Sequence, residues 1–168
     1  MKKLLILIIA ALLFTSCGTQ TKSNSKNKAN NKAAEQSEIT LDEVYNWLGG
    51  DIWNKGFCDI YHYVEDGKGA TGNDIDIEFT VDELKVSMEK KDKYEQFILS
   101  LDESVPENAQ IIKAWKKLSE QMDILYNKVI SETPRPKDPD YEFNTDLFSQ
   151  YLNSFEAAYR DIKWPDAK

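Results

Sequence analysis

The chain has 168 residues, of which 41% are hydrophobic and 30% are charged, and its formal net charge is −8. This length suits one folded domain with a buried core, and the acidic balance argues against a nucleic-acid-binding protein. Two cysteines and one histidine are too few for a zinc site built from Cys and His or for a disulfide framework.

The N-terminus has the layout of an export signal. Two lysines follow Met1, and an unbroken apolar run covers residues 4–14. A membrane-spanning helix needs about 20 apolar residues, so this shorter run is more typical of the apolar part of a signal peptide. Cys17 follows the run after two small polar residues. We therefore expect residues 1–16 to be a signal peptide.

Residues 14–17, Phe-Thr-Ser-Cys, resemble the lipobox of bacterial lipoproteins, with Phe14 where that family usually has Leu. In that family the signal is cut before the cysteine, whose sulfur carries a diacylglyceryl group. The resemblance implies that Cys17 is lipidated and that the chain is anchored on the exported side of a bacterial envelope membrane. Two acyl chains suffice for stable attachment, because one chain alone binds only reversibly. An ordinary secretory signal is the alternative.

A polar stretch follows the expected lipidated cysteine. Residues 18–36 contain no Val, Ile, Leu or aromatic residue. Such a segment cannot bury enough apolar surface to offset the entropy of ordering, so we expect a disordered tether over residues 17–36. The segment contains four lysines and a single glutamate. They would draw the tether to an anionic membrane, although a plain soluble spacer is an equal alternative.

Residues 37–168 are predicted to form an all-α domain, an up-down bundle of about four helices. With 15 basic and 28 acidic residues, this part has a net charge of −13. Such a surface favours basic partners or divalent cations, although solubility alone is the plainer interpretation.

The first predicted helix begins at Thr40, because Thr40 and Glu43 match a capping box. Apolar residues then follow at helical spacing as far as Val64. Gly49 and Gly50 interrupt this pattern, and glycine is unfavourable inside a helix. We therefore expect a kink or a close approach of another helix there.

The other three helices are predicted from similar signals. A second capping box from Thr80 to Glu83 starts a helix whose middle, residues 89–93, is entirely charged. Ser104 can cap a third helix, which carries the most regular apolar seam in the chain: Ile111, Trp115, Leu118, Met122, Leu125 and Val129. A fourth helix is expected to start near Asn144, after a proline-rich link, and to end at Trp164. Short links join the second helix to the third and the third to the fourth, so these neighbours are predicted to be antiparallel.

A glycine-rich loop is predicted between the first two helices. Residues 67–72, Gly-Lys-Gly-Ala-Thr-Gly, match the letters of a dinucleotide-binding motif. Such a site needs a helix that opens at the glycines, whereas residues 73–79 alternate between polar and apolar, and the acidic flanks would repel a pyrophosphate. The loop therefore indicates a flexible connector, and we predict no cofactor.

The same loop carries carboxylates that could hold a cation. Asp66, Asp74, Asp76 and Glu78 supply the oxygen ligands that calcium prefers, but their spacing does not match an EF-hand. They are candidate metal ligands, and a solvated acidic loop is the alternative.

Three other features have structural interpretations. His62 lies between two tyrosines and is interpreted as a surface or partly covered residue rather than a catalytic one. Cys58 is interpreted as a small buried hydrophobic residue, with an intermolecular link as the alternative. The four tryptophans and eight tyrosines are assigned to core packing in preference to a recognition patch.

The chain also resembles a family in outline. The lipobox and tether are followed by Tyr45-Asn46-x-Leu48-x-Gly50, by Gly-Ala-Thr-Gly at residues 69–72, and by three further predicted helices. This order is similar to that of the YiiG-like bacterial lipoproteins of uncharacterised function, over most of residues 40–162. The resemblance implies a helical fold at an envelope membrane and supplies no catalytic residues.

Three functions follow as hypotheses. The favoured one is a membrane-anchored, non-enzymatic binding module whose acidic helical face holds a basic protein or peptide. The second is a sensor of a small ligand or divalent cation that uses the loop at residues 65–78. The third is an envelope hydrolase that uses carboxylates such as Glu65, Asp66 or Asp74, although paired acids need a cleft that the sequence does not reveal.

Overall fold

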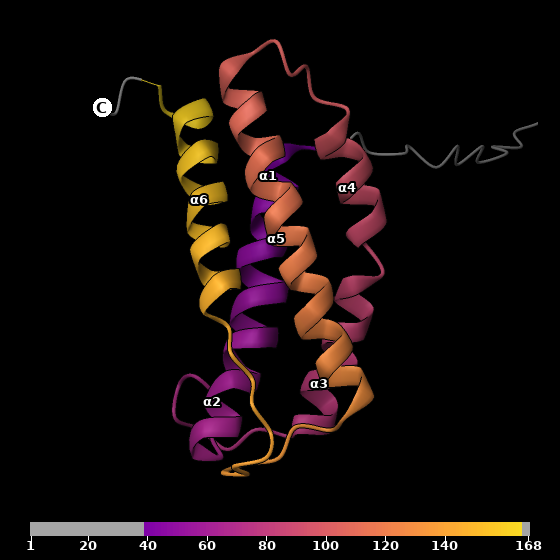
Figure 1. Cartoon of the computed structure of the whole chain (residues 1–168), viewed down its shortest axis with the longest axis vertical. Helices are drawn as coiled ribbons and strands as arrows, with labels where there is room; N and C mark the ends of the chain where they lie inside the picture. The colour runs from indigo at the N-terminus through magenta and orange to yellow at the C-terminus, as the bar shows by residue number, and fades with distance from the viewer. Residues whose placement is uncertain (1–38, 166–168) are drawn as a thin grey trace, which may run out of the picture. The chain divides into compact units, whose positions relative to one another are not determined.

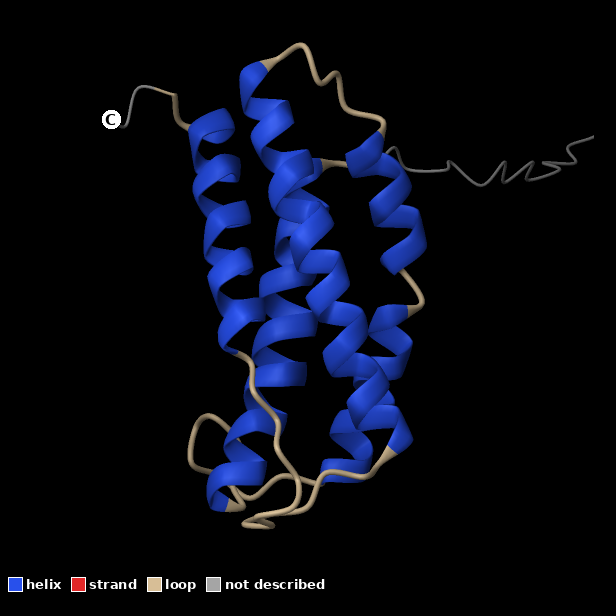
Figure 2. Cartoon of the chain, in the orientation of Figure 1, coloured by secondary structure: helices blue, strands red, loops and turns tan. Residues whose placement is uncertain are grey.

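The computed structural model describes residues 39–165, which belong to the compact unit that spans Ser37–Lys168. Its elements are α1 (Leu41–Asn46), η1 (Trp47–Phe57), α2 (Cys58–Asp66), α3 (Ile77–Met88), α4 (Lys91–Leu99), α5 (Pro106–Ser131) and α6 (Asp146–Lys163). No strand occurs between residues 39 and 165, which confirms the predicted all-α class (Figure 2). The predicted signal peptide, the tether and Cys17 lie outside the described residues.

The elements form four helical rods. α1, η1 and α2 follow one another without interruption, and α3 and α4 are separated only by residues 89–90. α6 packs along α5, α4 also contacts α5, and α3 contacts η1. Figure 1 shows that the chain runs in opposite directions along α5 and α6. Among the described helices, none has both the length and the hydrophobicity needed to cross a bilayer.

The hydrophobic core is centred on α5. All six residues of the predicted seam are at most 5% exposed, which confirms that part of the sequence analysis: Ile111, Trp115, Leu118, Met122, Leu125 and Val129. The Trp115 ring lies 6.4 Å from that of Trp47 and 6.1 Å from that of Phe155, so it joins η1 and α6 through α5. Core packing is confirmed for Trp47 and Trp115, whereas Trp164 is exposed.

Thr40 caps the start of α1 as predicted, and acidic side chains of the first turn accept hydrogen bonds from other helices. The Thr40 hydroxyl oxygen accepts a hydrogen bond from the Glu43 N–H at 3.2 Å. The Glu43 carboxylate accepts one from the Tyr94 hydroxyl of α4 at 2.9 Å. The hydroxyl of Tyr159 on α6 donates to Asp42 at 3.1 Å, and its ring stacks on Tyr45 with centroids 4.3 Å apart.

The double glycine does not bring two helices together. η1 is a π-helix that runs through Gly49 and Gly50, and a Cβ atom at either position would meet nothing within 4 Å. Of the two alternatives predicted there, a kink or a close approach, the close approach is therefore wrong. The close approach occurs at Gly56, where a Cβ atom would lie 2.9 Å from Cδ1 of Leu84 on α3. Gly56 leaves room for this buried leucine.

The predicted start of the second helix at Thr80 is also wrong. The N-cap of α3 is Asp76, whose Oδ1 accepts hydrogen bonds from the N–H groups of Glu78 and Phe79, both at 3.1 Å. Thr80 lies inside the helix, and its hydroxyl donates to the Asp76 carbonyl oxygen at 3.0 Å. Asp is as good a cap as Thr, and Ile77 can pack against the core once the helix begins one turn earlier.

This cap makes a testable difference between two neighbouring aspartates. Asp76→Ala should lower the free energy of unfolding by about 0.5–2 kcal/mol, because the first turn of α3 loses the acceptor for two N–H groups. Asp74→Ala should have a much smaller effect, since Asp74 is exposed and caps no helix. Urea denaturation of both variants measures this, and equal losses would contradict the assignment of the cap.

The other helix ends show where the predicted boundaries fail. The all-charged middle of the second predicted helix is where α3 ends and α4 begins. Val105, not Ser104, is the N-cap of α5, so the predicted Ser104 cap is wrong, and Pro106 opens the helix because its missing N–H costs nothing there. The side chain of Asn144 does bind at the start of α6, where its Oδ1 accepts a hydrogen bond from the Asp146 N–H at 2.8 Å.

Candidate functional site

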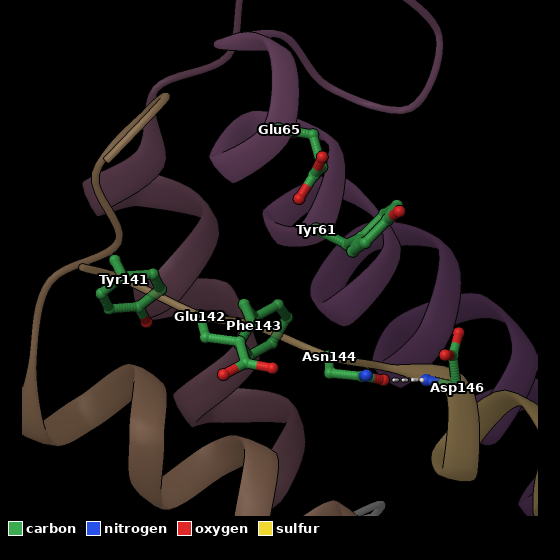
Figure 3. Close-up of a pocket in the computed structure, with 7 residues that line it drawn as sticks. All are labelled: Tyr61, Glu65, Tyr141, Glu142, Phe143, Asn144 and Asp146. Atoms are coloured by element: carbon green, nitrogen blue, oxygen red, sulfur yellow. Dashed lines mark hydrogen bonds between the residues drawn. The ribbon is translucent and has the colours of Figure 1, made fainter. Parts of the chain in front are cut away.

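A pocket of about 230 Å³ lies between α2 and the segment that leads into α6 (Figure 3). We call it the acidic pocket; it is lined by Tyr61, Glu65, Tyr141, Glu142, Phe143, Asn144 and Asp146. Figure 3 shows the first two side chains on α2 and the other five along the opposite segment. The pocket therefore depends on two parts of the chain that are far apart in sequence.

The segment before α6 is held by alternate side chains. Tyr141, Phe143 and Thr145 are buried, whereas Glu142 and Asn144 between them are exposed. The Phe143 ring lies 6.2 Å from the buried ring of Phe57 in η1. The aromatic residues thus anchor the segment to the core, and the polar ones remain available at the pocket.

The α2 side of the pocket is fixed by helical spacing and by the preceding link. Tyr61 and Glu65 are four residues apart, so they lie on one face of the helix. The N–H of Lys137 donates to the carbonyl oxygen of Val64 at 2.7 Å, which ties the proline-rich link to the end of α2. Lys137 has a left-handed backbone, with φ at 56°.

The electrostatics of the pocket are one-sided. Glu65, Glu142 and Asp146 are all exposed, and within residues 39–165 none of their carboxylates forms an ion pair or a side-chain hydrogen bond. No basic side chain lines the acidic pocket in this part of the chain. Unpaired carboxylates beside the partly exposed ring of Tyr61 favour a cationic group, which can contact both negative charge and an aromatic face.

The carboxylates do not meet at one point. No group of three or more His, Cys, Asp or Glu side chains in the described region could hold a metal ion. Glu65 lies on one side of the pocket, and Glu142 and Asp146 are spread along the other (Figure 3). Calcium takes six to eight oxygens around a single centre. This arrangement therefore suits several separate positive charges, such as those of a basic peptide, better than a single ion.

Tyr141 is the most deeply buried of the residues that line the pocket. Its side chain is 2% exposed, and among the described residues its hydroxyl has no hydrogen-bond partner. Burial, and secondly the negative charge of Glu132, raises the pKa of Tyr141 to about 12. The ammonium of Lys128 lies 4.4 Å from the centroid of the ring and holds it from the α5 side.

Two buried tyrosines predict a loss of stability in alkali. Burial, and secondly the hydrogen bond to Glu43, also raises the pKa of Tyr94 to about 12, from an ordinary value of 10.0. Because the folded state keeps these hydroxyls protonated, their contribution is complete below about pH 10 and disappears as the pH rises toward 12. Urea denaturation across this range should show a steep loss. The double variant Tyr94→Phe/Tyr141→Phe should lose less, and an unchanged pH dependence would contradict the prediction.

The candidate metal ligands in the glycine-rich loop are not brought together. Asp66 ends α2, and Asp74 forms an ion pair with Lys68. Asp76 caps α3, and Glu78 is an exposed residue in the first turn of that helix. The carboxylates named for the hydrolase hypothesis, Glu65, Asp66 and Asp74, are also separated. Of these three, only Glu65 lines the acidic pocket.

The glycines of this loop serve the backbone. Gly67 ends α2 with φ at 75°, and Gly72 has φ at 79°, a conformation that other residues rarely adopt. Between them, the N–H of Ala70 donates to Oδ1 of Asp59 on α2 at 2.8 Å. These turns account for the glycine spacing without a nucleotide.

His62 and Cys58 have the surroundings of structural residues. The His62 ring is partly buried and packs edge-on against Tyr61, with centroids 5.3 Å apart. Cys58 is free and only partly buried, rather than fully buried as predicted. Burial raises the pKa of its thiol.

Sequence reasoning did not find most of the acidic pocket. It named Glu65 as a possible catalytic carboxylate, but it treated residues 141–146 only as a link and a helix start. The available signal was the alternation of aromatic and polar residues from Tyr141 to Asn144. Comparisons with protein families, curated proteins and solved structures found no significant match to this chain.

Proposed function

We propose that this protein is a non-enzymatic binding module that holds a basic peptide or protein segment at the acidic pocket. The observation that carries this proposal is the set of three unpaired carboxylates, Glu65, Glu142 and Asp146, that line one pocket beside the ring of Tyr61. Anchoring at a bacterial envelope membrane through lipidated Cys17 belongs to the same proposal and rests on the lipobox-like residues 14–17.

The charge of the domain supports this function. A net charge of −13 over residues 37–168 draws basic ligands toward the whole surface and raises their association rate. Elsewhere, many carboxylates are already paired; Asp42 meets Lys163, and Asp51 meets Lys55. The three carboxylates of the pocket are unpaired and line one concave site, so they can act together on a bound cationic segment.

A charge-matched titration tests the proposed site. The buried core extends from Val44 to Tyr159, so residues 37–168 should fold alone. We expect this domain to bind an oligo-lysine peptide but not oligo-glutamate, with an affinity that falls as salt is added. Glu65→Gln/Glu142→Gln/Asp146→Asn should weaken binding about tenfold, since each lost pair contributes about 0.5 kcal/mol.

A second triple variant provides the control. Asp92→Asn/Glu107→Gln/Glu120→Gln removes the same charge from exposed positions on α4 and α5. It should bind oligo-lysine nearly as well as the parent domain. An equal loss in both variants would show that binding depends on net charge alone, and the proposed site would be wrong.

Lipidation is tested on the full chain. Expressed in a bacterium, it should carry a diacylglyceryl group on Cys17, detected by mass spectrometry, and should sediment with membranes. Cys17→Ser should release it from the membrane fraction. An unmodified Cys17 thiol would contradict the anchoring part of the proposal while leaving the binding site unaffected.

A further inference from the structure

A second concave surface of opposite character lies between α5 and α6. This groove has a volume of about 380 Å³. We call it the α5–α6 groove; its walls include Lys113 and Lys117 from α5 and Tyr151, Ser154, Ala157 and Ala158 from α6. Ser and Ala have short side chains, so another backbone could approach the groove closely.

Two exposed apolar residues extend the groove along both helices. Ile124 follows Lys117 by seven residues, and Leu147 precedes Ser154 by seven, so each lies two turns along the same helix face. Ile124 is 53% exposed and Leu147 is 49% exposed. Because α5 and α6 run in opposite directions (Figure 1), both residues extend the groove at the same end. From Lys113 to Ile124 the track is about 16 Å long, or three helical turns.

The groove carries positive charge in a strongly negative domain. Lys113 and Lys117 are one turn apart on α5, and in the described part of the chain neither forms an ion pair. The Lys117 ammonium lies 5.2 Å from the centroid of the Tyr151 ring, which holds it at the groove. Asp161 also lines the groove, so the two lysines leave its lining with a net charge of +1. An anionic group is therefore favoured at the lysine end.

We propose that the α5–α6 groove is the docking site for an amphipathic helix of another protein. Its apolar side chains, spaced three and four residues apart, would pack along the track that ends at Ile124 and Leu147, and its acidic residues would meet Lys113 and Lys117. A helix fits an open track between two antiparallel helices better than an acyl chain, because its polar face stays in water. This site is distinct from the acidic pocket and selects the opposite charge.

Two synthetic peptides test the proposal. Both have about 15 residues with leucines at helical spacing, and they differ only in carrying glutamates or lysines on the polar face. Fluorescence anisotropy with residues 37–168, in the Glu65→Gln/Glu142→Gln/Asp146→Asn background to disable the acidic pocket, should show the glutamate peptide binding at least about tenfold more tightly. Failure of the glutamate peptide to bind would overturn the proposal.

Matched variants separate the groove from general surface effects. Lys113→Gln/Lys117→Gln should weaken binding of the glutamate peptide at least about tenfold, whereas Lys90→Gln/Lys116→Gln removes the same charge elsewhere and should not. Likewise, Ile124→Ser/Leu147→Ser should weaken binding, and Phe79→Ser/Val86→Ser, which changes exposed apolar residues on α3, should not. Equal losses in a variant and its control would overturn the proposal.

Two further results would identify a different occupant and overturn the proposed one. Phosphatidylglycerol vesicles that bind through Lys113 and Lys117, while the glutamate peptide does not, would indicate a membrane surface. Light scattering that shows dimers in the parent domain and monomers in Ile124→Ser/Leu147→Ser would indicate a second copy of the chain.

Discussion

Trp115→Ala is expected to lower the free energy of unfolding by about 3–5 kcal/mol, the range typical of a buried aromatic residue truncated to alanine. Trp115 is completely buried, and its ring contacts those of Trp47 and Phe155. Its removal would leave a cavity where η1, α5 and α6 meet, and close packing around it limits collapse. Urea or thermal denaturation of residues 37–168 measures the loss.

Two variants of α5 make this prediction specific. Ile124→Ala changes an exposed residue of the same helix and should alter stability by no more than about 0.5 kcal/mol. Trp115→Phe should cost less than Trp115→Ala, because it keeps an aromatic ring and removes an indole N–H that has no partner among the described residues. A loss in Trp115→Ala no larger than that in Ile124→Ala would contradict the described core.

Gly56→Ala is expected to destabilise the domain by about 1–3 kcal/mol, the usual cost of overpacking. The added methyl group would lie 2.9 Å from Cδ1 of Leu84 and 3.2 Å from the Asp51 carbonyl oxygen. Leu84 is 1% exposed and has little room to move, and the carbonyl belongs to the π-helix backbone. η1 and α3 would have to separate, which thermal denaturation would detect as a lower Tm.

The neighbouring glycines should show the opposite sign. A Cβ atom at Gly49 or Gly50 meets nothing within 4 Å, so alanine there adds no clash. Gly50→Ala should stabilise the domain by up to about 1 kcal/mol, because alanine loses less backbone freedom on folding. A stabilising Gly56→Ala would contradict the close contact between η1 and α3.

The most regular part of the sequence predicted the structure best. The apolar seam of α5 repeats at steps of three and four residues over the whole helix, and all of it is buried. An apolar seam of this length specifies which face of the helix is buried, and the helix propensities of single residues do not change that face. The second predicted helix has no such seam through its charged run at residues 89–93, and there the structure breaks it into α3 and α4.

Boundaries and glycines were harder to predict, because both depend on contacts outside the local sequence. Thr80 and Asp76 are comparable N-caps, and packing of Ile77 against the core favours Asp76. Gly49-Gly50 is the more conspicuous glycine pair, yet Leu84 lies against Gly56. Only the docking of α3 against η1 distinguishes these glycines.

The acidic pocket could be predicted only in part. Its carboxylates are visible in the sequence, but the acidic balance was compatible with basic partners, with divalent cations or with solubility alone. Their placement around one pocket depends on the proline-rich link, which returns to α2 through the hydrogen bond between Lys137 and Val64. No local pattern connects Glu65 with Glu142, which is 77 positions further along the chain.

Chemical-shift mapping with an oligo-lysine peptide tests the central claim most directly. On an assigned NMR spectrum of residues 37–168, we expect the largest changes on Tyr61 and Glu65 of α2 and on residues 141–146. Changes spread evenly over the acidic surface, or centred on the loop at residues 66–78, would contradict it.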